Sequence, residues 1–97
     1  MKLLSIIFSF RNEEQNIKEL IARVSSVLNK LNNWKYELIF VNDDSDDNSE
    51  KILIESQKFH PIIIVNMSRK FGVGPCVLAG LELAKGDAVI YMDSDLQ

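Results

Sequence analysis

The last eleven residues of the chain are Asp87-Ala88-Val89-Ile90-Tyr91-Met92-Asp93-Ser94-Asp95-Leu96-Gln97. An apolar run in this stretch ends abruptly at two aspartates, Asp93 and Asp95. Residues two apart in a β-strand point to the same face, so these carboxylates would converge at the strand's carboxyl end. Two hard oxygen donors suit Mg²⁺ or Mn²⁺. Asp and Ser also form polar turns that merely close a strand, and this short motif alone favours the turn.

Three more apolar runs precede this one, and each has the composition of a buried strand. The predicted strands are residues 3–10, 34–41, 62–66 and 88–92. Helical signals between them predict helices over about 13–31, 49–59 and 74–85. Helical crossovers between buried strands indicate a parallel sheet with right-handed connections. We therefore predict one α/β domain over residues 1–97, with helices on both faces of the sheet and strand order 3-2-1-4.

Local signals set the expected ends of the first two helices. Asn12, followed by Gln15 three residues later, has the spacing of a capping box. Asp47 together with Glu50 can cap the second helix, which is expected to run to Phe59.

The third helix is expected to begin with Pro75 at its first position and to end at Gly86 as the glycine after its last turn. Gly80 in its middle costs about 1 kcal/mol against alanine and therefore suggests close backbone packing. The predicted inward-facing stripe of this helix consists of Val77, Leu78, Leu81 and Ala84.

Polar clusters follow all four predicted strands. They are residues 11–14, 42–49, 68–72 and 93–95. Parallel strands place their carboxyl ends at one edge of the sheet, which is where open α/β sheets bind ligands. We therefore expect the four clusters to meet at one crevice, although they are far apart in the sequence.

The chemistry of these clusters favours an anionic ligand held through a cation. A carboxylate about 4 Å from a diphosphate costs roughly 4 kcal/mol at an effective dielectric of about 20. A divalent cation between Asp93, Asp95 and a diphosphate reverses that sign and stabilises the diphosphate as a leaving group. Asp43 can accept a hydrogen bond from a nucleobase or a ribose, and Arg69 offers a planar fork for phosphate. Lys70 is expected to be a surface charge.

Composition excludes several classes of protein. The net charge of −3 argues against a general nucleic-acid binder. The single cysteine, Cys76, permits no internal disulfide, favours a reducing compartment and is expected to pack in the core. No apolar run approaches the ~20 residues that span a bilayer, so a cytoplasmic location is expected. The Gly72-Val73-Gly74 segment lacks the third glycine of a dinucleotide fingerprint, and no Walker A sequence is present.

Five motifs together resemble the N-terminal, nucleotide-binding half of a family 2 glycosyltransferase of the GT-A fold. The similarity is strongest to the dolichyl- or undecaprenyl-phosphate sugar transferases and spans almost the whole chain. The motifs that carry it are Ser9-Phe10-Arg11-Asn12-Glu13-Glu14-Gln15-Asn16-Ile17, Val41-Asn42-Asp43-Asp44-Ser45-Asp46-Asp47, Ser68-Arg69-Lys70-Phe71-Gly72, Leu78-Ala79-Gly80-Leu81 and Met92-Asp93-Ser94-Asp95-Leu96-Gln97.

The resemblance implies a Rossmann-like half-domain that binds a UDP- or GDP-linked sugar, with a lipid phosphate as a candidate acceptor. Asp43 would contact the base, and Asp93 and Asp95 would hold Mg²⁺ or Mn²⁺. The nucleotide-sugar-binding residues implied are Ser9, Arg11, Glu13, Asn42, Asp43, Arg69, Asp93 and Ser94. The family's general base and acceptor site lie beyond the metal motif. We therefore expect a fragment that binds a nucleoside diphosphate without transferring sugar, and a full-length protein at the cytoplasmic face of a membrane.

Two other functions are compatible with the residues. Clustered aspartates also bind Mg²⁺ in phospho-acceptor signalling domains, but those domains place paired acids after the first strand, where this chain has Arg11-Asn12-Glu13-Glu14. Alternatively, an open sheet edge and uncovered apolar surface would favour a non-catalytic homo-oligomer.

Overall fold

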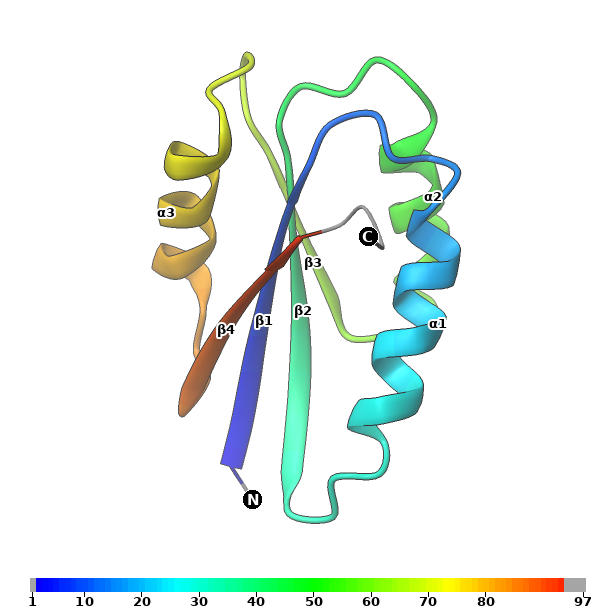
Figure 1. Ribbon diagram of the computed structural model, residues 1–97, viewed down its shortest axis with the longest axis vertical. Coiled ribbons are helices and arrows are strands. Elements are labelled where there is room, and N and C mark those ends of the chain that lie inside the picture. Colours follow the sequence, from blue (N-terminus) through cyan, green and yellow to red (C-terminus); the bar gives the residue numbers. More distant parts are fainter. Residues whose placement is uncertain (1, 94–97) are drawn as a thin grey trace.

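The structure is a computed structural model that describes residues 2–93. Its elements are β1 (Lys2–Phe10), α1 (Ile17–Leu28), β2 (Trp34–Asn42), α2 (Ser49–Ser56), β3 (Ile62–Asn66), α3 (Val73–Leu83) and β4 (Ala88–Asp93). The four strands are all parallel and lie in the order β3-β2-β1-β4 (Figure 1). This confirms the predicted α/β class, the parallel sheet and the strand order.

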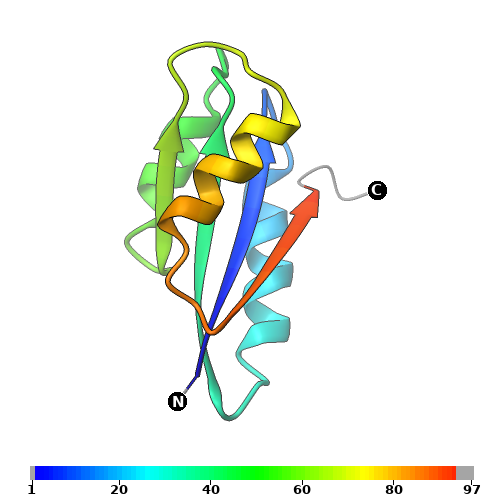
Figure 2. The ribbon, with the colours of Figure 1, turned by 90° about the vertical axis from the view of Figure 1, so that its left-hand side faces the viewer.

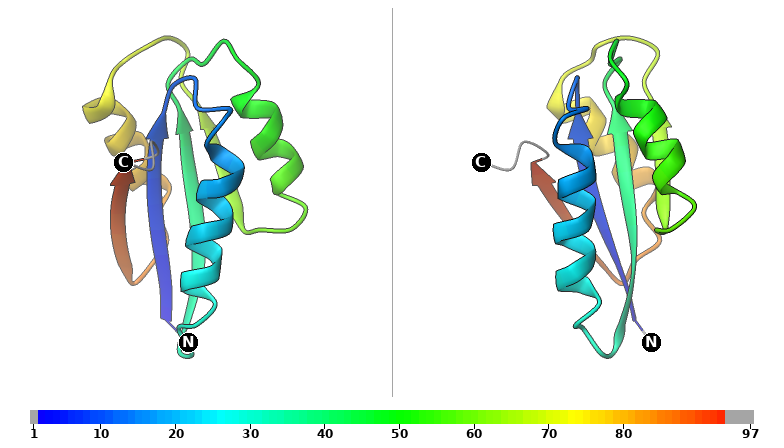
Figure 3. Two further views of the ribbon diagram at one scale, coloured as in Figure 1. Left: turned by 45° about the vertical axis from the view of Figure 1, so that its right-hand side comes forward. Right: turned by 90° about the vertical axis from the view of Figure 1, so that its right-hand side faces the viewer.

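The helices cover both faces of the sheet. α1 and α2 lie on one face and α3 lies alone on the other (Figures 2 and 3). On the α1 side, the core centres on Phe8 and Phe40, whose rings stack with centroids 4.7 Å apart. On the α3 side, Ile7 and Ile39 pack with their neighbours. Because successive strand residues point to opposite faces, each strand of the central pair contributes to both layers.

The same alternation positions the polar ends of the strands. Ser9 follows Ile7 by two residues and therefore lies on the α3 side of the sheet. In the β1–β4 pairing, Ile7 is opposite Tyr91 and Ser9 is opposite Asp93. Tyr91 and Asp93 thus share the α3 side with Ser9, at the carboxyl end of the sheet.

The edge strand β4 carries apolar side chains on both faces. Val89, Ile90, Tyr91 and Met92 are all exposed. Ile90 and Met92 face a wholly apolar groove formed with α1 and the start of β1. Such two-sided apolar composition is typical of an interior strand of a parallel sheet rather than of an edge.

Two helix ends differ from those predicted. α1 begins at Ile17, because Asn12 is part of the preceding loop in the left-handed region with φ of 55°. Its backbone N–H donates to Ser45 Oγ at 2.9 Å, and its Oδ1 accepts from the backbone N–H of Asp46 at 2.9 Å. Asn12 therefore joins two loops instead of capping α1, and that prediction is wrong. α2 also ends earlier than predicted, at Ser56.

The predicted inner stripe of α3 is wrong for its two leucines, whereas Ala84 packs against the core on this side of the sheet. Cys76 and Gly80 are the buried residues of this helix, whereas Leu78 and Leu81 are 63% and 45% exposed. A Cβ added to Gly80 would lie 2.6 Å from Ile7 Cγ2, so the helix packs on β1 through its backbone. The expected close packing at Gly80 is confirmed, and it leaves no room for leucines between the helix and the sheet.

Gly86 does not end α3 in the way predicted. It has no positive φ, whereas Gly72, just before α3, has φ of 91°. A Cβ at Gly86 would lie 2.5 Å from Ser5 Oγ and 2.7 Å from Ser5 N, and its own N–H donates to Ser5 Oγ at 2.9 Å. Glycine is needed here because the chain passes directly against β1.

Replacing Gly80 with alanine is expected to lower the free energy of unfolding by about 1 kcal/mol. The substitution gains up to about 1 kcal/mol in helix propensity, but the new methyl overlaps Ile7 Cγ2, and the stiff β-branched side chain cannot turn away. Overpacking of this kind costs about 1–3 kcal/mol. Urea unfolding followed by the fluorescence of Trp34 measures the change.

The matched control for this prediction is the same substitution in an Ile7→Ala background. There the clashing atoms are absent, so Gly80→Ala should become stabilising. An equal effect in both backgrounds would mean that Ile7 does not set the closeness of α3 to the sheet.

Candidate functional site

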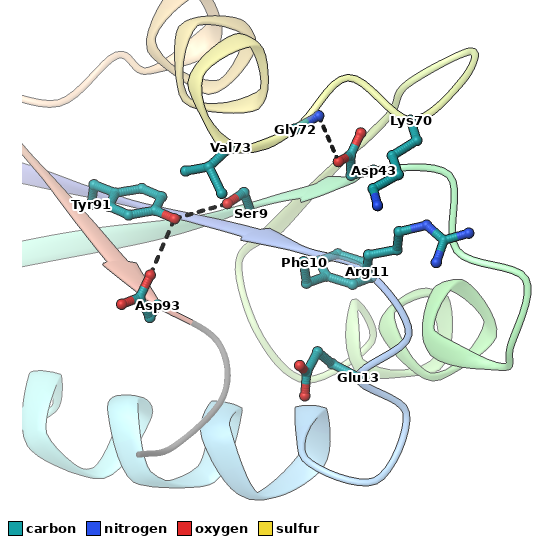
Figure 4. A pocket seen from close by; sticks show the side chains of 10 residues that line it. All are labelled: Ser9, Phe10, Arg11, Glu13, Asp43, Lys70, Gly72, Val73, Tyr91 and Asp93. Atoms are coloured by element: carbon teal, nitrogen blue, oxygen red, sulfur yellow. Dashed lines mark hydrogen bonds between the residues drawn. The ribbon is translucent and has the colours of Figure 1, made fainter.

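A pocket of about 410 Å³ opens at the carboxyl ends of β1, β2 and β4 (Figure 4). It is lined by Ser9, Phe10, Arg11, Glu13, Asp43, Lys70, Gly72, Val73, Tyr91 and Asp93. These residues come from the ends of β1 and β4, from the loops after β1, β2 and β3, and from the first residue of α3. The expectation that distant polar clusters meet at one edge of the sheet is therefore confirmed for the part of the chain that the structure describes.

Asp43 forms the inner wall of the pocket and is only 6% exposed. Its Oδ1 accepts from the backbone N–H of Phe71 at 2.7 Å, and its Oδ2 accepts from that of Gly72 at 2.9 Å. Burial by itself would raise the pKa of the Asp43 carboxyl. The two backbone hydrogen bonds, with the Cys76 thiol and the charge of Lys70, outweigh burial and hold this pKa below its usual value.

The charged Asp43 carboxylate has a consequence for its neighbour Cys76, which is fully buried at the start of α3. Burial, followed by the Asp43 charge, raises the pKa of the Cys76 thiol to about 11. The thiol is therefore protonated at neutral pH, as expected for a core residue, and can donate to the carboxylate.

The loops after β1 and β2 are joined by four hydrogen bonds, two of them through Asn12. In the other two, the backbone N–H groups of Glu13 and Glu14 donate to Ser49 Oγ at 3.0 Å and to Asp47 Oδ2 at 3.2 Å. Asp47 Oδ1 also accepts from the Ser49 N–H at 2.9 Å. The positions of Arg11 and Glu13 at the pocket are thus fixed by a loop more than thirty residues away.

The pKa of the Asp47 carboxyl is also lower than its usual value. Burial by itself would raise the pKa of its carboxyl, but hydrogen bonds from the Ser49 hydroxyl, the Ser49 N–H and the Glu14 N–H together lower it.

We expect the protein to lose stability in acid more steeply than its surface charges alone would predict. Asp43 and Asp47 both have folded-state pKa values below the ordinary aspartate value of about 3.9. Between the two values the unfolded chain binds more protons than the folded one, so stability falls with pH. The contribution is complete above the unfolded pKa and is lost as pH falls through the folded pKa.

Urea unfolding at a series of pH values from 6 to 2.5 tests this expectation. Asp43→Asn and Asp47→Asn should each flatten the acid limb, whereas Asp44→Asn should not, because Asp44 is exposed. An unchanged acid limb in both of the first two variants would contradict the assignment.

Five of the predicted nucleotide-site residues lie together at this pocket. They are Ser9, Arg11, Glu13, Asp43 and Asp93. The structure supplies their placement, and their roles stay predictions.

Two other predicted residues lie elsewhere. Asn42 is buried and donates from Nδ2 to Asn66 Oδ1 at 3.0 Å, while its Oδ1 accepts from the Ser45 N–H at 2.9 Å. The guanidinium of Arg69 lies 4.9 Å from the ring centroid of Phe71, outside the pocket lining. Ser94 and Asp95 lie outside the described residues.

Two pocket residues were missed by the sequence analysis. Lys70 is exposed, as expected for a surface charge, and it also lines the pocket. Tyr91 was treated as part of an apolar strand. Its hydroxyl lies 2.9 Å from Ser9 Oγ and donates to Asp93 Oδ1 at 3.3 Å. The signal that could have found Tyr91 is its position two residues before Asp93, which puts both on one face of the strand.

The pocket lining contains three carboxylates, Glu13, Asp43 and Asp93, and two cations, Arg11 and Lys70. The net charge of the described lining is therefore −1.

Within residues 2–93, no group of three or more His, Cys, Asp or Glu side chains is arranged to hold a metal ion. Nor does any helix in that range combine the length and apolar character that crossing a membrane requires.

The parallel sheet and its strand order define an α/β fold of the kind found in GT-A glycosyltransferases. The sequence profile described as "Glycosyl transferase family 2" matches residues 5–97, and the chain therefore belongs to that family.

Similar proteins agree with this assignment. The chain is 46% identical over 95 residues to the uncharacterized glycosyltransferase sll0501 of Synechocystis sp., covering 97% of this chain and 30% of the relative. It is 35% identical over 99 residues to an undecaprenyl-phosphate 4-deoxy-4-formamido-L-arabinose transferase of Pseudomonas savastanoi pv. phaseolicola, covering 100% of this chain and 29% of the relative. The chain thus spans about 30% of the length of these curated relatives.

Among solved structures, the fold is similar to that of the mannosyltransferase PcManGT from Pyrobaculum calidifontis, in complex with GDP-Man and Mn²⁺. The TM-score is 0.82 at 19% sequence identity, covering 95% of this chain and 27% of that chain.

Proposed function

We propose that residues 1–97 form the donor-binding unit of a sugar-transferring enzyme, and that the pocket binds the nucleoside diphosphate of a sugar nucleotide. One observation carries this proposal: Ser9 near the end of β1, Asp43 just after β2 and Asp93 at the end of β4 line a single pocket. The family membership of the chain and the nucleotide sugar bound by PcManGT support the same class of ligand.

The pocket has two chemically different ends, which suggest how the ligand lies. Arg11, Asp43 and Lys70 gather at one end, while Ser9, Tyr91 and Asp93 gather at the other (Figure 4). We assign the nucleoside to the first end and the diphosphate to the second. Arg11 and Lys70 draw the anionic ligand toward a lining that is otherwise acidic.

The residues at the diphosphate end fit a divalent cation in their donor chemistry. Asp93 supplies a carboxylate, the kind of hard oxygen donor that Mg²⁺ and Mn²⁺ prefer, and the Ser9 and Tyr91 hydroxyls lie beside it. We propose that Asp93, together with Asp95, holds the ion. When bound, the cation would neutralise the charge of the departing diphosphate. What the protein residues do is bind and orient the donor.

The acceptor is proposed to be a polyprenyl phosphate, since the relative from Pseudomonas savastanoi is named as an undecaprenyl-phosphate sugar transferase. A lipid acceptor would place the reaction of the whole protein at a membrane surface.

Isothermal titration calorimetry tests the proposal: the 97-residue chain is titrated with UDP and with GDP, once in Mn²⁺ and once in EDTA. We expect metal-dependent binding of at least one nucleotide and its loss in Asp93→Asn. Uridine and guanosine are the matched controls, because each keeps the nucleoside of its nucleotide and lacks only the diphosphate. If neither nucleotide binds in Mn²⁺, the proposal is wrong.

Self-association is a second candidate function, and the apolar edge strand favours it. Within residues 2–93, β4 lies at one edge of the sheet and has exposed side chains on both faces, which is a template for pairing with another chain. Light scattering over a range of protein concentrations tests this, with Ile90→Lys expected to reduce the apparent mass. A monomer at all concentrations would exclude it.

A further inference from the structure

We propose that Tyr91 is a positioning residue for the cation site: its hydroxyl orients the Asp93 carboxylate toward the bound ion. This inference rests on the proposed function, because it assigns a role within the same pocket. It concerns a residue that belongs to none of the motifs that carry the family resemblance. Three side chains at the carboxyl ends of β1 and β4 take part in this arrangement.

The three side chains are brought together by strand register. Ser9 is directly opposite Asp93 in the parallel β1–β4 pair, and Tyr91 precedes Asp93 by two residues on the same face. The Tyr91 ring therefore extends along the sheet toward both neighbours, and its oxygen lies between them (Figure 4).

The direction of the hydrogen bonds follows from the number of protons. The ionised carboxylate of Asp93 can only accept, so Tyr91 donates its single hydroxyl proton to Asp93 Oδ1 at 3.3 Å. In the 2.9 Å contact with Ser9, the tyrosine oxygen must then accept, and the Ser9 hydroxyl donates. Two hydrogen bonds in series thus point toward the carboxylate and hold one of its oxygens, which leaves the other turned away from the tyrosine.

Hydrogen-bond donors placed beside a metal ligand in this way also orient the ligands of metal sites in other proteins. Carboxylates that bind a metal are commonly held by hydrogen bonds from neighbouring groups, and loss of such a neighbour lowers metal affinity by about 10- to 100-fold. The Asp93 side chain is exposed at the pocket, so a hydrogen bond from a neighbouring side chain limits the orientations that its carboxylate can take.

The test is the Mn²⁺ dependence of UDP and GDP binding by Tyr91→Phe, which removes the hydroxyl but keeps the ring. The matched control is Tyr36→Phe, which removes the same group at the opposite end of the sheet, where Tyr36 pairs with Leu4. Tyr91→Phe should require roughly 10- to 100-fold more Mn²⁺ for half-maximal nucleotide binding. Tyr36→Phe should require no more Mn²⁺ for half-maximal nucleotide binding than the wild-type chain does. Circular dichroism verifies that both variants are folded.

Two further readouts separate positioning from direct contact with the ligand. Nucleotide affinity measured in EDTA should be the same for Tyr91→Phe and the wild-type chain. Asp93→Asn is expected to abolish the Mn²⁺ dependence of binding, and adding Tyr91→Phe to it should leave the residual nucleotide affinity unchanged, because the tyrosine acts through the aspartate.

Each outcome decides the inference. If the wild-type chain binds neither nucleotide in Mn²⁺, the proposed function fails and the role of Tyr91 fails with it. If the wild-type chain binds and Tyr91→Phe has the same Mn²⁺ requirement, only the role of Tyr91 is overturned. If Tyr91→Phe weakens binding equally in Mn²⁺ and in EDTA, the tyrosine contacts the nucleotide directly, and the positioning role is again overturned.

Discussion

Asp43→Asn is expected to lower the free energy of unfolding by about 2 kcal/mol and to weaken the binding of UDP and GDP about tenfold or more. The carboxylate accepts two backbone hydrogen bonds, from Phe71 and Gly72, at 2.7 and 2.9 Å. An asparagine can accept only one of them, and its amide group would turn a donor toward the other donor. The loop before α3 would then lose one of its two hydrogen bonds to the Asp43 side chain.

The effect on binding follows from what this loop contributes to the pocket. Lys70, Gly72 and Val73 form one wall, and the first hydrogen-bonded residue, Phe71, lies between them. Loosening the loop displaces the whole wall. We therefore expect both nucleotides to lose affinity by the same factor, with the unfolding measured in urea and the binding by calorimetry.

The control is Asp44→Asn, which makes the same change one residue further along the chain. The Asp44 carboxylate is exposed and makes no hydrogen bond within residues 2–93, so this variant should retain the stability and affinity of the wild-type chain. A loss of affinity for only one nucleotide in Asp43→Asn would contradict the loop role. It would favour the base contact that the family resemblance implies for this residue.

The sheet was predictable from the sequence because its signals are local. Each buried strand is a short apolar run, and the residues between successive runs have helical periodicity or capping patterns. Parallel topology then requires the strand ends to meet, so the convergence of Ser9, Asp43 and Asp93 could be expected before any contact was known.

The errors arose where a distant segment decided the local structure. Asn12 has the spacing of a capping residue, but its partners are Ser45 and Asp46, more than thirty residues away. The leucines of α3 were expected to face inward on grounds of hydrophobicity. The close contact between Gly80 and Ile7 admits only small residues, so the leucines lie outside.

The residues missed in the pocket have the same explanation. Whether Lys70 faces solvent or the pocket depends on how Asp43 anchors its loop, which no pattern within residues 68–72 indicates. The polar role of Tyr91 depends on the register that sets Ser9 opposite Asp93. Both facts belong to the packed structure and not to the local sequence.

Reversing the charge of both pocket cations, in Arg11→Glu with Lys70→Glu, is expected to weaken Mn²⁺-dependent binding of UDP and GDP by about 100-fold or more. The described lining has a net charge of −1, and the double variant changes it to −5, with five carboxylates and no cation. A diphosphate entering this pocket would meet repulsion that one divalent ion does not offset. Calorimetry in Mn²⁺ measures the loss of affinity. Added salt should reduce the difference in affinity between the variant and the wild-type chain.

The change in total charge must be separated from the change at the pocket. Lys51→Glu with Lys58→Glu provides the match, because both lysines are exposed and neither lines the pocket. Either double variant takes the net charge of the chain from −3 to −7, since each substitution subtracts two. If the two double variants lose affinity equally, the long-range charge of the chain accounts for the effect, and Arg11 and Lys70 have no special role. If only the pocket variant fails, these two cations offset the acidity of the lining and allow an anionic donor to enter.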